Sequence, residues 1–283
     1  LLSAWYMEHN GHFVTGMNNQ IAWGMPHVFA VFLIVAASGA LNVASIGSVF
    51  GRLVYKPLAR LSGLLAISLL VGGLTVLMLD LGRPDRLIVA MTNYNFKSIF
   101  ALNIFLYTGF MGIAAIYIWT LMDRKMKPFS FLAGVAMFIW RLALTTGTGL
   151  IFGFLVAREA YDAALLAPLF IAMSFVFGMA IFVLMMLVVS SADDRPLGDY
   201  IIQRMGKLMI ILIAANLYFV TVQHLTTLYA AEHSGVEAFI LTSGNTFTWH
   251  FWLLQIGVGA LLPLALLMRP VRSLTKLNVG LAS

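Results

Sequence analysis

Seven long apolar segments dominate the chain and restrict the folds that it can adopt. Each contains the ~20 residues that an α-helix needs to cross a hydrocarbon core of ~30 Å. Only 10% of the 283 residues are charged, compared with roughly 25% in a soluble domain. The sequence therefore predicts an all-α, polytopic transmembrane helix bundle with the spans Pro26–Phe50, Leu58–Leu79, Ser98–Leu121, Phe129–Val156, Leu165–Ser190, Leu208–Ala230 and Phe247–Met268.

The start of the chain carries the pattern of a further helix. The first residues, LLSAWYM, resemble the end of a preceding apolar helix. We therefore expect residues 1–283 to form a single transmembrane domain that is truncated at both ends, with partial helices flanking the seven spans.

The chain has no cysteine, which excludes iron–sulfur ligation, c-type haem attachment and zinc–thiolate sites within it. Its basic residues follow the loops, so nucleic-acid binding is not indicated.

The basic residues predict the orientation, because loops rich in lysine and arginine stay on the cytoplasmic side. They gather after the first, third, fifth and seventh spans: Arg52, Lys56, Arg60; Arg124, Lys125, Lys127; Arg195, Arg204, Lys207; Arg269, Arg272, Lys276. The first span then starts outside. This topology puts several titratable groups at or near the outer face: His9, His12, His27, His224, His233, His250, Asp80, Arg83, Arg158 and Glu159.

Asp80 ends the second span in the stretch LMLDLGRPDR. Gly82 can cap the helix and Pro84 prevents its continuation, but the carboxylate falls where the helix end is already negative. Two interpretations remain open. Arg83 could pair with Asp80 and close the helix, or Asp80 could be a protonatable group at a ligand site where Arg83 holds the acid or a ligand oxygen.

Polar residues also mark the interior of the bundle. Ser38, Asn42 and Ser45 fall on the helix face headed by His27, and a histidine there can exchange protons near neutral pH. Arg141 lies about a dozen residues into the fourth span, where an unpaired cation is costly. Asn103 and Tyr107 form a comparable stripe on the third span. These residues predict a proton path, although each could instead serve helix packing.

The outer layer offers two kinds of redox site. A quinone ring needs partners for its two oxygens and an apolar slot for its tail, and His27, Asp80 and Arg158 with Tyr161 could supply the polar set. The alternative is a b-type haem between His224 and His250, but cytochrome b ligands generally lie deeper and no second pair exists at the other side. We predict no metal ligand set in this chain.

Four stretches of the sequence resemble the NrfD/PsrC family, the quinone-interacting membrane subunits of polysulfide reductase and related complexes. They are WGMPHVFAVFLIVAASG, LDLGRPDR, NFKSIFALNIFLY and TFTWHFWLLQIGVGALLPLALL. The longer stretches MNNQIAWGMPHVFAVFLIVAASGALNVASI and TTGTGLIFGFLVAREAYDAA resemble the DsrP branch, which belongs to the sulfite-reduction-associated complex of sulfur-metabolising bacteria.

The resemblance implies a subunit that oxidises quinol or reduces quinone, menaquinone or ubiquinone, near the periplasmic face of the bacterial inner membrane. His27 and Asp80 match the family's histidine and helix-end acid, whereas the family's arginine matches Arg158 less securely. The branch has ten helices and binds no haem or metal itself. Its partners would be a periplasmic ferredoxin-like iron–sulfur protein, a multihaem cytochrome c, a b-type membrane cytochrome and a cytoplasmic iron–sulfur subunit, besides membrane lipid.

Two other classes use the same features. A secondary transporter or ion channel would need a polar interior of this kind, but the sequence shows no clear internal repeat and no matching pair of interrupted helices. A purely structural anchor for redox subunits is the other alternative.

Overall fold

The computed structural model describes residues 2–19, 21, 23–81, 84–192, 198–268 and 276–283. Within these ranges the chain is helical and contains no strand. Seven helical stretches are long and apolar enough to cross a membrane: Met25–Ser48, Val54–Asp80, Ile99–Met122, Lys127–Gly153, Leu166–Ala192, Asp199–Tyr229 and Thr246–Leu267. The predicted polytopic bundle and its seven spans are confirmed, and the chain is a multi-span integral membrane protein.

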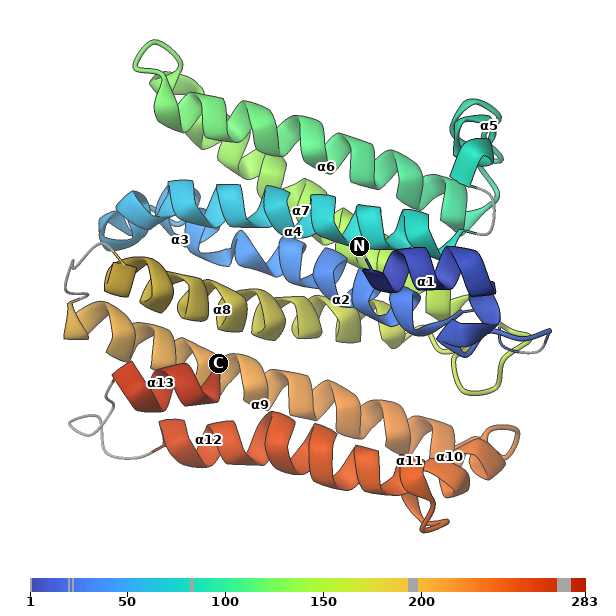
Figure 1. Cartoon of the computed structure of the whole chain (residues 1–283). Helices are drawn as coiled ribbons and strands as arrows, with labels where there is room; N and C mark the ends of the chain where they lie inside the picture. The colour runs from blue at the N-terminus through green and yellow to red at the C-terminus, as the bar shows by residue number, and fades with distance from the viewer. Residues whose placement is uncertain (1, 20, 22, 82–83, 193–197, 269–275) are drawn as a thin grey trace. The chain divides into compact units, whose positions relative to one another are not determined.

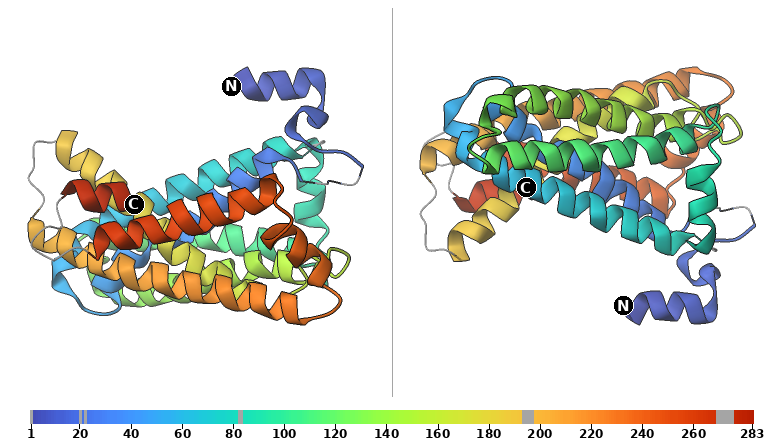
Figure 2. Two further views of the ribbon diagram at one scale, coloured as in Figure 1. Left: turned by 90° about the horizontal axis from the view of Figure 1, so that it is seen from below. Right: turned by 90° about the horizontal axis from the view of Figure 1, so that it is seen from above.

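The chain forms two compact units, Leu1–Gly147 and Thr148–Ser283. The first unit contains four long helices with short elements between them (Figure 1). Its elements are α1 (Leu2–Asn10), η1 (His12–Thr15), α2 (Met25–Ala40), α3 (Asn42–Ser48), η2 (Leu53–Leu58), α4 (Ala59–Asp80), η3 (Pro84–Arg86), α5 (Leu87–Thr92), α6 (Ile99–Met122), η4 (Lys127–Phe129) and most of α7 (Ser130–Gly153). Figure 2 shows α1 outside the group formed by α2, α4 and α6.

The core of the first unit lies between α2, α4, α6 and α7. Small residues on α2 and α4 let these helices approach closely, and larger side chains from α6 and α7 fill the space between them. The buried residues of this core include Ile34, Ala37, Ala66, Leu70, Phe110, Tyr117, Met137 and Leu144. Because α2 and α4 pack along their length, the start of α2 and the end of α4 lie at the same end of the unit.

Gly73 is where α4 comes closest to α2. A Cβ atom there would lie 2.9 Å from the Ile34 side chain and 3.2 Å from the carbonyl oxygen of Ala30. At the adjacent Gly72 the nearest atom, in Leu33, is 3.9 Å away. Of these two adjacent glycines, Gly73 is therefore the one on which the close packing of α4 against α2 mainly depends.

Gly73→Ala should lower the free energy of unfolding by about 1–3 kcal/mol, because the added methyl group meets backbone atoms that cannot move aside. Gly72→Ala is the matched control and should leave stability unchanged or raise it by up to about 1 kcal/mol, since alanine favours helix over glycine. Thermal unfolding of the detergent-solubilised protein measures both. Equal effects of the two substitutions would contradict this account of the contact.

The first span is interrupted, whereas the sequence predicted one continuous helix from Pro26 to Phe50. The regular series of α-helical hydrogen bonds is interrupted at Leu41, between α2 and α3. Ser62 of α4 bridges the break, because its hydroxyl donates to the Ala40 carbonyl (2.6 Å) and accepts from the Ala44 N–H (3.2 Å). A broken helix can persist in a membrane when neighbouring helices satisfy its backbone groups.

The second unit is built around two long antiparallel helices. Its elements are the end of α7, α8 (Leu166–Ala192), α9 (Asp199–Tyr229), α10 (Ser234–Leu241), α11 (Thr246–Trp249), the π-helical η5 (His250–Leu261), α12 (Leu262–Leu267) and α13 (Lys276–Ala282). The sixth span was predicted from the apolar run that begins at Leu208, and its helix α9 begins nine residues earlier, at Asp199. Its first turns carry Arg204 and Lys207, and such charged turns can extend a helix beyond the hydrocarbon.

Candidate functional site

His27 stands in the first turn of α2, where its position is fixed by local chemistry. Pro26 suits the start of a helix because its fixed φ favours the helical conformation and its missing N–H would have no partner there. The backbone N–H of His27 donates to the Gly24 carbonyl oxygen at 3.1 Å. The imidazole ring stacks on the indole of Trp23, with ring centroids 4.9 Å apart and nearly parallel planes. The ring is therefore held in one orientation at the helix end.

Asp80 is the last residue of α4 and lies beside His27. The Asp80 Oδ2 and His27 Nδ1 atoms are 3.3 Å apart, and the two side chains are only 6% and 13% exposed. The other carboxylate oxygen, Oδ1, is buried and accepts no hydrogen bond from any described residue. The predicted layer of titratable groups thus contains a buried imidazole–carboxylate pair in which one carboxylate oxygen has no hydrogen-bond donor among the described residues.

A third titratable group, His12, lies near this pair. His12 was predicted from the sequence to lie at the outer face but was not included among the site residues. His12 of η1 interacts electrostatically with the Asp80 carboxylate. Its Nε2 atom is 3.9 Å from Glu8 Oε1 on α1. His12 and Asp80 are 68 positions apart in the sequence, so no local pattern predicts that they interact. The only local signal is the four-residue spacing of Glu8 and His12, which favours contact between these two side chains.

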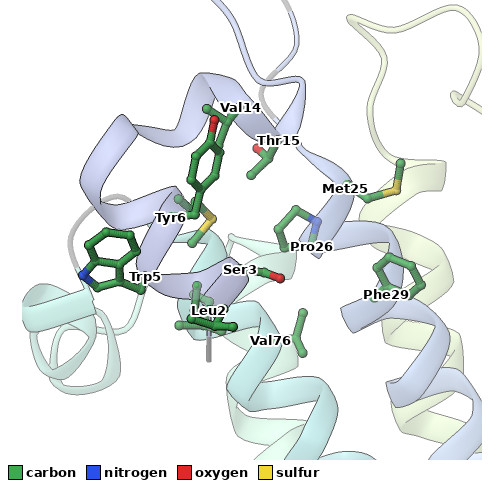
Figure 3. Close-up of a pocket in the computed structure, with 13 residues that line it drawn as sticks. Leu2, Ser3, Trp5, Tyr6, Val14, Thr15, Met25, Pro26, Phe29 and Val76 are labelled. Carbon is green, nitrogen blue, oxygen red and sulfur yellow. The ribbon is translucent and has the colours of Figure 1, made fainter.

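An apolar pocket of about 730 Å³ adjoins the pair. It lies between α1, α2 and α4, and Figure 3 shows Leu2 and Tyr6 of α1 on one side with Pro26, Phe29 and Val76 on the other. Pro26 and Leu79, which also line it, are the chain neighbours of His27 and Asp80. The pocket has the size of a small-molecule site, and its lining is mostly hydrocarbon.

A smaller apolar cavity of about 310 Å³ lies between α4, α5 and α6. Its walls include Leu77 and Leu81 at the end of α4 and Tyr107 of α6. Tyr107, predicted as part of a proton path, therefore faces this cavity.

The other predicted interior residues form two groups. Arg141 is buried, and its Nη1 donates to the Asn42 Oδ1 (2.6 Å) and to the Ser38 carbonyl oxygen (3.1 Å) at the α2–α3 break. Asn103 donates instead to the carbonyl oxygens of Ile99 and Gly147, both at 2.9 Å. The structure thus joins Arg141 to Asn42, while the side chain of Asn103 bonds to the backbone of α6 and α7.

The other predicted residues are described separately from this pair or lie outside the described residues. Gly82 and Arg83 lie outside the described residues, as do Arg195, Arg269 and Arg272 of the basic loops. Arg158 is exposed and Tyr161 packs on Phe152 (5.4 Å between centroids), both in the second unit between α7 and α8. The His27–Asp80 pair is described within the first unit alone.

The two histidines of the haem alternative have local partners in the second unit. His224 Nδ1 lies 2.8 Å from Glu237 Oε2 on α10, and Thr227 donates to the other oxygen of that carboxylate at 2.6 Å. His250 Nδ1 lies 2.6 Å from the Thr246 carbonyl oxygen. The first contact joins α9 to α10. Neither contact tests haem binding, so the absence of haem stays a prediction.

Together these features define a class: a polytopic helical membrane protein with a buried imidazole–carboxylate pair beside an apolar pocket at one end of a four-helix unit. The family model described as polysulphide reductase, NrfD, matches residues 13–281, and the chain therefore belongs to the NrfD family. The family resemblance inferred from the sequence is confirmed.

Three known proteins are similar to most of the chain. The Hdr-like menaquinol oxidoreductase integral membrane subunit of Archaeoglobus fulgidus is 28% identical over 258 residues, which cover 91% of this chain and 65% of that protein. A putative dimethyl sulfoxide reductase membrane subunit of Halobacterium salinarum is also 28% identical, with 95% and 67% covered. A selenate reductase subunit of Mesobacillus selenatarsenatis is 22% identical, with 94% and 71% covered. The chain thus spans about two thirds of the length of these relatives.

Proposed function

We propose that the chain is the quinone-interacting membrane subunit of a respiratory redox complex. The observation that carries the proposal is the buried His27–Asp80 pair beside the 730 Å³ apolar pocket, in which the Asp80 Oδ1 atom has no hydrogen-bond partner among the described residues. The relative from Archaeoglobus fulgidus is named a menaquinol oxidoreductase subunit, which supports the same ligand class.

The residues present fit a quinol. Its head group carries two hydroxyls that need acceptors, and Asp80 Oδ1 is a buried acceptor without a partner among the described residues. Its isoprenoid tail needs an apolar slot, and the pocket beside Pro26 and Leu79 provides one. When bound, a quinol supplies two electrons and two protons on oxidation to the quinone.

Each protein group has a definite task in this proposal. Asp80 accepts a hydrogen bond and then a proton from the head group, within the hydrogen-bond reach that general base catalysis needs. His27 shares that proton through its 3.3 Å contact with Asp80, while Trp23 keeps the ring oriented. The side chains of α1 cover the pocket and exclude water from the tail.

The proposal extends to membrane topology. Asp80 and Arg60 lie at opposite ends of the 22-residue helix α4, about 30 Å apart at 1.5 Å per residue. Arg60 belongs to a basic loop, so the positive-inside rule supports a periplasmic location for the His27–Asp80 end in a bacterial inner membrane. The redox partners that follow are those of the DsrP branch: a periplasmic ferredoxin-like iron–sulfur protein, a multihaem cytochrome c, a b-type cytochrome and a cytoplasmic iron–sulfur subunit.

Proton translocation is a second part of the proposal. Its path would run through Arg141, Asn42, Asn103 and Tyr107. The hydrogen bond between Arg141 and Asn42 supports the first step of this path, because it joins α7 to the interrupted span.

Filling the pocket should block the tail without touching the polar pair. Val76→Trp places a large ring in the pocket and should weaken binding of a menaquinone analogue by about tenfold or more, which corresponds to ~1.4 kcal/mol. Thr75→Trp is the matched control, since Thr75 is exposed and does not line the pocket. Equilibrium binding to the complex in nanodiscs measures both. Unchanged affinity in Val76→Trp would remove the pocket from the proposal.

A further inference from the structure

Four titratable side chains run from the buried pair toward the surface of the first unit. Their side-chain exposures rise from 6% for Asp80 and 13% for His27 to 23% for His12 and 56% for Glu8. The described electrostatic neighbours of Asp80 are His27 and His12. This series of titratable groups therefore begins at a buried residue, Asp80, and ends at an exposed residue, Glu8.

His12 has the geometry of a bridging group. Its Nε2 atom faces Glu8 at 3.9 Å, and its Nδ1 atom is buried with no hydrogen-bond partner among the described residues. Asp80 Oδ1 is likewise buried without a described partner. An imidazole can take a proton at one nitrogen and release one from the other, which suits it to a shuttle between two carboxylates.

The backbone around His12 holds it at this position. The turn from α1 into η1 passes through Gly11 at φ 91°, and Gly16 ends η1 at φ 90°, a left-handed conformation that favours glycine. The Thr15 hydroxyl donates to the His12 carbonyl oxygen at 2.7 Å. These contacts fix the local conformation of η1, and Val14 and Thr15 of this segment line the same pocket as Leu79 near the end of α4.

We propose that His12 and Glu8 form the proton exit from the Asp80–His27 pair to the aqueous surface. The inference rests on the proposed quinol oxidation. Each turnover removes two electrons and two protons from the quinol. The electrons pass to the iron–sulfur partner, and each proton passes from Asp80 to His12, then to Glu8 and to bulk water, directly or through one intervening water. Asp80 is thereby reset for the second proton.

The test compares His12→Gln with wild type in the assembled complex. Quinol-dependent electron transfer at saturating quinol should fall by about tenfold or more, because a neutral amide cannot relay the proton. The affinity for a menaquinone analogue should stay unchanged. Imidazole added to the outer medium should restore much of the rate, as a mobile proton carrier can replace the missing ring. His9→Gln, an exposed histidine on the neighbouring short helix α1, is the control and should keep the wild-type rate.

Three outcomes would overturn the relay: a wild-type rate in His12→Gln, a slow rate that imidazole does not restore, or a loss of quinone affinity in this variant. Glu8→Gln repeats the test at an exposed position where folding is not at risk, and it should show a smaller loss with the same rescue by added buffer. Failure of wild-type protein to bind quinone would instead remove the proposed function, so the two failures are distinguishable.

Discussion

Asp80→Asn is expected to lower quinol-dependent electron transfer by about 100-fold or more, the lower range for loss of a general base. Asparagine keeps the size of the side chain but cannot take the proton that Oδ1 would receive. The buried position of Asp80 makes replacement of its role by water difficult. Steady-state reduction of the iron–sulfur partner by quinol, with assembly of the complex checked in parallel, measures the effect.

Asp85→Asn is the matched control for this experiment. It makes the same chemical change on an exposed carboxylate five residues further along the chain, and it should leave the rate near wild type. His27→Ala should lose activity as Asp80→Asn does, with assembly preserved. Wild-type turnover in both the His27 and Asp80 variants would refute the site.

Arg141→Leu is expected to destabilise the first unit by about 2–4 kcal/mol, because the Asn42 amide oxygen and the Ser38 carbonyl lose a charged donor in a buried position. Thermal unfolding should shift downward by on the order of 5–10 °C. Arg60→Leu is the control, since the exposed Arg60 should contribute far less. Equal shifts in the two variants would contradict the role of Arg141 at the helix break.

Arg141→Gln separates this structural role from the proposed proton path. Glutamine can still donate one hydrogen bond, so more of the fold should survive than in the leucine variant. Reconstituted vesicles should then show reduced proton uptake per electron transferred if Arg141 belongs to the path. Uptake equal to wild type would remove the path and leave Arg141 as a helix-packing residue.

The sequence predicted the spans well because hydrophobic length is a local property. It also predicted that His27 and Asp80 share a layer, since each stands at a helix end on the same side of the membrane. The contact itself depends on the close packing of α2 and α4, which Gly73 permits. A glycine pair in the sequence does not reveal which of its members makes that approach.

Other features depend on contacts between distant residues and could not be predicted. The break at Leu41 needs Ser62 on another helix to satisfy its backbone groups, and no proline or glycine at position 41 marks it. The place of His12 beside Asp80 depends on the path of the chain through η1. No local sequence signal predicts the π-helical η5, because its composition is that of an ordinary apolar helix.

The central claim is that the quinol head group binds at the His27–Asp80 pair. A structure of the assembled complex with a bound menaquinone analogue tests it most directly. We predict a head-group oxygen within hydrogen-bond distance of Asp80 Oδ1 or the His27 ring, and the tail in the pocket between α1, α2 and α4. A head group bound elsewhere, with this pocket empty, would contradict the account.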